Sequence, residues 1–117
     1  MATTITPTAL VKNTASANLA MSGGTAFTDA TEAVIDYPRE GSLLIVINST
    51  YAGANTFTVK AGEFLSSGQG DIETPTAQNG VYFIPVESSR VKDFDGDITV
   101  TFGTSNTGFI RAIQLPY

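Results

Sequence analysis

Residues 40–50 read EGSLLIVINST. The centre of this segment, Leu43–Ile47, is continuously apolar; residues 40–42 (EGS) precede it and the polar residues 48–50 (NST) follow it. A run of this length is too short for a buried helix, and a strand that is apolar at every position is typically buried on both faces. We therefore expect Leu43–Ile47 to be the central strand of a sheet.

Segments that follow this strand alternate apolar and polar residues, as strands with one face in a core do. They are residues 56–60, 97–102 and 109–115. Residues 81–86 form a further apolar run, in which Pro85 cannot donate a ladder hydrogen bond, so this strand should lie at a sheet edge or bend there. Turn residues separate the strands at roughly ten-residue intervals. The pattern predicts one all-β domain, an antiparallel β-sandwich or jelly-roll-like body.

The body is expected to begin near Val34, and its core should contain eight large side chains from the predicted strands. These are Ile45, Ile47, Phe57, Val59, Phe83, Val100, Phe102 and Ile110. The sequence thus predicts a sandwich body over residues 34–117.

Residues 1–33 differ in character, because they are rich in Ala, Ser and Thr and contain only scattered large apolar residues. We expect them to form an extended N-terminal arm and a loose connection, with one strand around Ala9–Asn13. The segment from Ala2 to Asn18 is predicted to bind a neighbouring molecule instead of completing its own core. A loop that wraps its own domain is the alternative.

The composition leaves little room for catalysis. The 117 residues contain no cysteine and no histidine, which excludes disulfides, thiol nucleophiles, zinc–thiolate sites and the usual base of a catalytic triad. The net charge of −5 disfavours binding to nucleic acid or to an anionic membrane surface. Residues 1–7 do not resemble a secretory signal, and no apolar run approaches the roughly 20 residues of a membrane span. We expect a protein that is made in the cytoplasm and is not an enzyme.

Two segments resemble ligand-binding loops only superficially. Asp93–Asp97 alternates acids with a glycine but lacks the remaining ligands of a calcium loop, so we expect a hairpin turn centred on Asp95-Gly96. Ser66–Asp71 lacks the lysine and the following helix of a phosphate-binding loop, and we expect a surface loop there.

Two further features also receive structural interpretations. Glu87–Lys92 places two serines near charged residues, and we expect a solvated corner with an ion pair from Glu87 to Arg90 or Arg111, not a serine–lysine hydrolase. Four tyrosines could contact a sugar or a protein, but they equally suit the margin of a β core: Tyr37, Tyr51, Tyr82 and Tyr117. We assign no catalytic, cofactor-binding or metal-binding residue and expect no cofactor.

Five segments carry a resemblance to a known group of proteins: residues 41–53, 56–62, 68–71, 86–91 and 107–116. In the order of their strands and turns they resemble the head decoration (capsid-cementing) proteins that tailed phages encode beside the major capsid protein. The resemblance implies a β-rich virion protein on the capsid exterior, which binds the major capsid protein, forms a homo-oligomer and stabilises the shell. Residues 1–33 match this group less well.

Two other function classes stay open at this point. A β-sandwich with tyrosine-bearing loops also suits a carbohydrate-binding or adhesion module. Another virion structural subunit, such as a tail or head-completion protein, is the third class.

Overall fold

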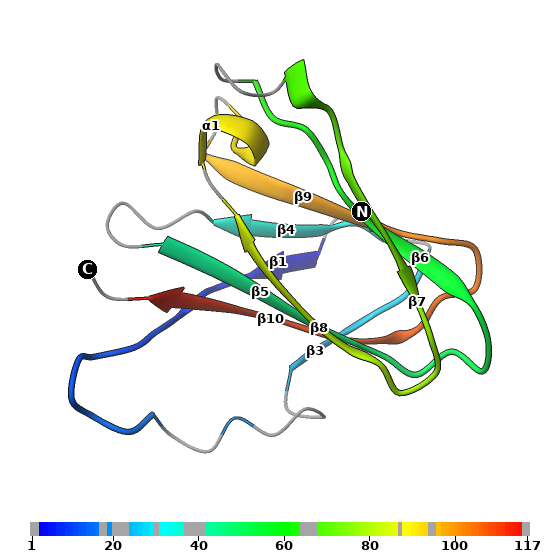
Figure 1. Cartoon of the computed structure of the whole chain (residues 1–117), viewed down its shortest axis with the longest axis horizontal. Coiled ribbons are helices and arrows are strands. Elements are labelled where there is room, and N and C mark those ends of the chain that lie inside the picture. Colours follow the sequence, from blue (N-terminus) through cyan, green and yellow to red (C-terminus); the bar gives the residue numbers. More distant parts are fainter. Residues whose placement is uncertain are drawn as a thin grey trace.

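The computed structural model describes residues 3–16, 19, 24–29, 31–36, 42–63, 68–86, 88–93 and 96–115. These residues form two β-sheets packed together, with one turn of α-helix, α1 (Ser88–Val91), beside them (Figure 1). The predicted β-sandwich is confirmed. Within the described ranges, no helix is long and apolar enough to cross a membrane.

Each sheet contains five strands. The first sheet has the order β1 (Thr3–Ile5), β4 (Ala33–Asp36), β9 (Asp97–Phe102), β6 (Asn55–Val59) and β7 (Ile72–Thr76). The second has the order β2 (Thr8–Ala9), β10 (Gly108–Leu115), β5 (Ser42–Ser49) and β8 (Val81–Val86), and β3 (Thr25–Phe27) also pairs with β10. The pairs among β3 to β10 are antiparallel, as predicted. The sheets are nevertheless mixed, because β1 and β2 add in the parallel direction to β4 and β10.

The chain passes between the sheets at both sides of the sandwich. A short link joins β1 to β2 at one side. At the other side, β7 and β8 are the edge strands of the two sheets, and a short link joins them (Figure 1). In the turn between β7 and β8, the Ala77 N–H donates a hydrogen bond to the Tyr82 hydroxyl at 2.8 Å. Asn79 has φ 60°, a left-handed conformation that asparagine tolerates. Of the two positions that Pro85 allowed for residues 81–86, an edge or a bend, the structure shows the edge.

Inward side chains of both sheets form one core. Of the eight predicted core residues, six are buried and Phe102 is half-buried against them: Ile45, Ile47, Phe57, Val59, Val100 and Ile110. Phe102 also stacks on Phe27, with ring centroids 3.8 Å apart. The prediction is wrong for Phe83, whose side chain is 62% exposed. Alternation along β8 directs Tyr82 and Ile84 toward the core, so Phe83 lies on the opposite face.

Strand β5 lies between β10 and β8, as expected of the central strand. On its inward face Leu43, Ile45 and Ile47 are fully buried. On its other face Val46 is also buried, whereas Leu44 is half-buried. Burial on both faces is thus complete at Val46 and only partial at Leu44.

A buried polar cluster links the two sheets. The Ser49 hydroxyl of β5 donates to Asn106 Oδ1 at 3.0 Å, and Asn106 Nδ2 donates to the carbonyl oxygen of Thr56 in β6 at 2.8 Å. Ser49 and Asn106 are both fully buried. The loop between β9 and β10 thereby fastens a strand of each sheet.

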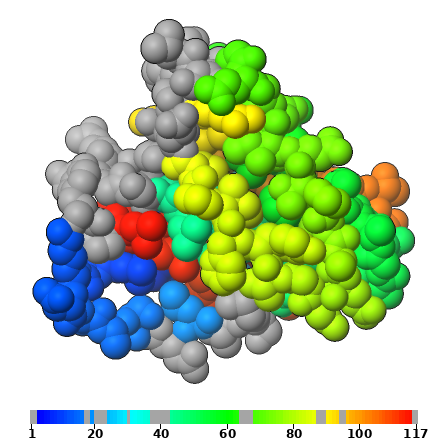
Figure 2. Space-filling model, in the orientation of Figure 1, coloured from blue at the N-terminus to red at the C-terminus, as the bar shows by residue number. Residues whose placement is uncertain are grey.

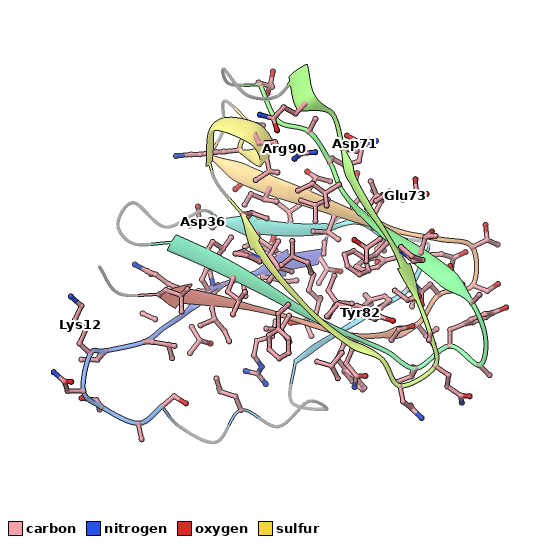
Figure 3. All side chains as sticks on the ribbon, in the orientation of Figure 1. Lys12, Asp36, Asp71, Glu73, Tyr82 and Arg90 are labelled. Atoms are coloured by element: carbon pink, nitrogen blue, oxygen red, sulfur yellow. The ribbon has the colours of Figure 1, made fainter. Side chains whose placement is uncertain are left out.

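The N-terminal residues contribute to the body more than the sequence predicted. Ile5 of β1 and Phe27 of β3 are buried in the core. Part of the predicted arm therefore completes the core of its own domain. The strand expected at Ala9–Asn13 is instead Thr8–Ala9, paired with β10. The sheet edges that accept β1 and β2 are formed by strands distant in sequence, which local composition does not reveal. Residues 11–16, which follow β2, are exposed, and Figure 3 shows Lys12 at one side of the molecule, pointing away from the sheets.

Candidate interaction surface

The outer face of the second sheet is formed almost entirely by apolar side chains. Residues directly opposite each other on paired strands point to the same face of a sheet. The register of β10, β5 and β8 therefore places three rows on this face: Phe109–Asn48–Val81, Arg111–Val46–Phe83 and Ile113–Leu44–Pro85. Seven of these nine residues are apolar and none is acidic. We call these nine residues the apolar face.

The outer face of the first sheet has the opposite character. Its ten residues, placed by the same register argument, are Thr4, Val34, Asp36, Thr56, Thr58, Glu73, Pro75, Asp97, Thr99 and Thr101. Five are threonines and three are acids, a composition suited to contact with water. We call these ten residues the threonine face. Because the two outer faces differ so strongly, the molecule has one side suited to solvent and one suited to a partner.

Exposure is greatest where the apolar face reaches the edge strand β8. Phe83 is 62% exposed and Val81 is 39% exposed, while Val46 at the centre is buried. Val46, Asn48, Phe109 and Arg111 line a shallow depression beside this centre. In Figure 2, atoms of β8 (yellow-green) lie on the surface toward the viewer, next to atoms of β5 (teal) and β10 (red). Contiguous apolar surface of this kind marks protein-interaction sites.

The free edge of β8 presents backbone groups as well as side chains. The Ser49 N–H donates to the Gly80 carbonyl at 3.0 Å, so that carbonyl points toward β5. Backbone groups alternate in direction along a strand, and therefore those of Val81, Phe83 and Pro85 point away from β5. No strand of the described residues pairs with this side of β8. The edge thus offers the N–H groups of Val81 and Phe83 and three carbonyls, while Pro85 has no N–H.

The acidic segment before β9 forms a turn, as predicted for its described residues. The Gly96 N–H donates to the Asp93 carbonyl at 3.1 Å, and the Asp97 N–H donates to Asp93 Oδ1 at 3.0 Å. Gly96 has φ 90°, which favours glycine. The turn joins α1 to β9, so it does not close the predicted hairpin. Asp95 lies outside the described residues, and the described ones contain no group of three metal-ligating side chains.

The loop predicted at Ser66–Asp71 is described from residue 68 onward. The Ala61 N–H donates to Asp71 Oδ1 at 2.7 Å, and the Lys60 ammonium donates to Asp71 Oδ2 at 3.0 Å. Both contacts favour the carboxylate, so the pKa of Asp71 is lowered from its ordinary value. These bonds anchor the start of β7 to the end of β6.

Arg90 also anchors this loop. Its Nε donates to the Gly70 carbonyl at 3.3 Å, and one terminal nitrogen donates to Gln69 Oε1 at 3.4 Å. Figure 3 shows Arg90 and Asp71 at the same end of the molecule. Glu87, the predicted ion-pair partner, and the side chains of both serines beside it lie outside the described residues.

Of the two described tyrosines, Tyr82 has a structural role. Tyr82 is half-buried, and its ring lies 5.9 Å from that of Phe57 while its hydroxyl is bonded to the β7–β8 turn. Tyr51 is half-buried, and Tyr37 and Tyr117 lie outside the described residues. Among the described residues, the aromatic side chain that is exposed is that of Phe83, which was predicted to lie in the core. Residues 81–86 are apolar at nearly every position, and this was the available signal, because one face of any strand in a two-layer sandwich has no partner sheet.

Comparisons with protein-family models, with curated proteins and with solved structures found no match. Function is therefore inferred from the residues and geometry of the chain itself. They provide an interaction surface: an apolar sheet face that continues into an open strand edge.

Proposed function

We propose that this protein is a virion structural protein, a decoration protein that binds the major capsid protein on the outside of a tailed-phage capsid and stabilises the shell as a homo-oligomer. The apolar face is the observation that carries the proposal, since it provides a surface for a protein partner on an otherwise acidic molecule. The resemblance of residues 41–116 to decoration proteins supports the capsid as that partner. The threonine face then remains toward solvent.

The energetics suit a protein that is bound in many copies. Complete burial of an exposed phenylalanine contributes about 1.5–3 kcal/mol, and Phe83 begins 62% exposed. One such contact is modest, but a ligand that binds only the assembled shell stabilises each occupied site by about 2.7 kcal/mol when its free concentration is 100 times Kd. Repetition over a capsid multiplies this effect.

Carbohydrate binding has less support from the described surface. A sugar needs hydrogen-bonding groups around an exposed ring, whereas the neighbours of Phe83 on the apolar face are mainly apolar. The Tyr82 hydroxyl is already bonded within the turn. A tail or head-completion subunit could use the same apolar face, and the test below distinguishes that role.

The test is co-sedimentation of the purified protein with expanded capsids that lack it. We expect binding by the natural protein, at least tenfold weaker binding by Phe109→Lys, and unchanged binding by the control Thr58→Lys on the threonine face. Circular dichroism should verify that both variants are folded. Absence of binding by the natural protein contradicts the capsid role, and equal losses in both variants contradict the assignment of the face. Binding to isolated tails instead would favour the tail subunit.

A further inference from the structure

The open edge of β8 has the properties of a surface that pairs with itself. Val81 and Phe83 direct their N–H and carbonyl groups away from β5, and their side chains are exposed on the apolar face. Natural proteins commonly protect such an edge with charged side chains or with proline. β8 reads VYFIPV: it contains no charged residue, and its one proline, Pro85, lies near its end and leaves the N–H groups of Val81 and Phe83 open. We propose that β8 pairs antiparallel with β8 of a second copy, joining the second sheets of the two copies across a two-fold axis.

Hydrogen-bond geometry allows this pairing without loss. In an antiparallel ladder, outward-facing residues must lie opposite outward-facing residues. In two such registers with a two-fold axis, both outward N–H groups of each edge meet a carbonyl within Val81–Pro85 of the other copy: Phe83 opposite Phe83 of the second copy, or Val81 opposite its Phe83. In both registers all four outward N–H groups of the two edges find a carbonyl partner. Pro85 contributes only its carbonyl, so its missing N–H costs no bond in either arrangement.

Charge also favours contact at this place. Each copy has a net charge of −5, so two copies repel each other unless the contact lies where carboxylates are few. No acid lies on the apolar face or in β8. The edge strand of the first sheet on the same side of the sandwich is β7. Its Glu73, which pairs with Thr58, belongs to the threonine face and so points away from the apolar face. β8 itself is therefore an uncharged strand of an acidic molecule, and the nearest carboxylate along the chain is that of Glu87, which follows its end.

The contact area predicts a weak dimer. The strand from Val81 to Pro85 is about 17 Å long at roughly 3.4 Å per residue, and the molecule is 23 Å thick. Side-by-side contact then covers about 400 Å² on each copy, below the roughly 800 Å² per partner of standard stable interfaces. Such a dimer forms at high concentration, or where copies are held close together on a surface.

Pairing at β8 would also enlarge the surface that meets another partner. The apolar faces of the two copies would lie in one continuous sheet, with the two Phe83 side chains close to the axis. The pairing identifies the interface of the homo-oligomer in the proposed function, and it holds for the chain alone. Its test contains no capsid, so failure of the dimer and failure of capsid binding are separate results.

Sedimentation of the full chain between about 5 μM and 1 mM tests the association, a range that spans weak dimers. The weight-average mass should rise from 12.3 kDa toward twice that value. Phe83→Lys, which places a charge at the axis, should raise the dissociation constant at least tenfold. Phe109→Lys adds the same charge on the apolar face away from β8 and should change it less than threefold. A natural chain that stays monomeric, or equal effects of the two variants, overturns the proposal.

Hydrogen exchange tests the backbone pairing without any substitution. The amides of Val81 and Phe83 should exchange rapidly in dilute protein and gain at least tenfold protection at dimer concentrations. Those of Tyr82 and Ile84 face β5 and should be protected at both concentrations. A dimer that leaves Val81 and Phe83 unprotected would use another surface, and the proposal would be wrong.

Discussion

Replacing Asn106 with alanine should destabilise the fold by about 2–4 kcal/mol. The substitution leaves the fully buried Ser49 hydroxyl without its acceptor at 3.0 Å, and an unpaired buried polar group costs about 1–3 kcal/mol. It also removes the bond from Asn106 Nδ2 to the Thr56 carbonyl, worth about 1 kcal/mol net. That carbonyl keeps a second bond, from the Gly103 N–H at 3.0 Å, so its own burial adds no further penalty.

Urea unfolding followed by far-ultraviolet circular dichroism measures this loss, since the chain has no tryptophan for fluorescence. Thr104→Ala, in the same loop but exposed, is the control and should change stability by less than about 0.5 kcal/mol. In a Ser49→Ala background, the effect of Asn106→Ala should shrink by about 1–2 kcal/mol because the two side chains are bonded. A loss below about 0.5 kcal/mol for Asn106→Ala, or strictly additive losses, would refute the role of the cluster as a link between the sheets.

Three further perturbations test other parts of the fold. Ile45→Ala should cost about 2–5 kcal/mol and the half-buried Leu44→Ala about 1 kcal/mol in urea unfolding, and equal losses would contradict the partial exposure of Leu44. Because folding lowers the pKa of Asp71, the Asp71 carboxylate stabilises the fold at pH values above its ordinary pKa of about 4, and this stabilisation is lost as the pH falls below it. The natural chain should therefore be slightly more stable than Asp71→Asn at pH 7 and equal to it in acid; an advantage that grows on acidification contradicts this. Deleting residues 1–18 removes β1, β2 and the buried Ile5, and should lower stability by about 2 kcal/mol or more; an unchanged melt would show that these strands do not support the core.

The strands of the body could be predicted because their signals are local. Alternation at residues 97–102 and 109–115 reflects a pleated strand with one face in a core, and both segments form strands with that orientation. Leu43–Ile47 could be placed at the centre of a sheet because this run is apolar at every position, which is also a local signal. The missing N–H of Pro85 limited its strand to a sheet edge or a bend, and the structure has it at an edge.

The interaction surface could not be predicted, because it depends on the order of strands. An apolar segment such as 81–86 has two apolar faces, and sequence alone does not say which of them another sheet will cover. The structure puts Tyr82 inside and Phe83 outside because the register of β8 with β5 pairs Tyr82 with the inward Ile47 and Phe83 with Val46 of the outer face. The edge position of β8 then leaves Phe83 exposed. Similarly, Ile5 is buried only because a distant edge, that of β4, accepts β1.

The arrangement of edges decides what kind of assembly self-pairing can produce. A two-fold contact uses the same edge on both copies, so formation of the β8 pair leaves no free β8 edge for a third copy. At the opposite edge of the second sheet, β10 is covered by β2 and β3, which have two and three residues and are poor templates for a long partner strand. Association through this sheet therefore stops at two copies instead of continuing as a fibre. An exposed apolar edge, which is usually an aggregation hazard, can in this topology provide a closed and specific contact.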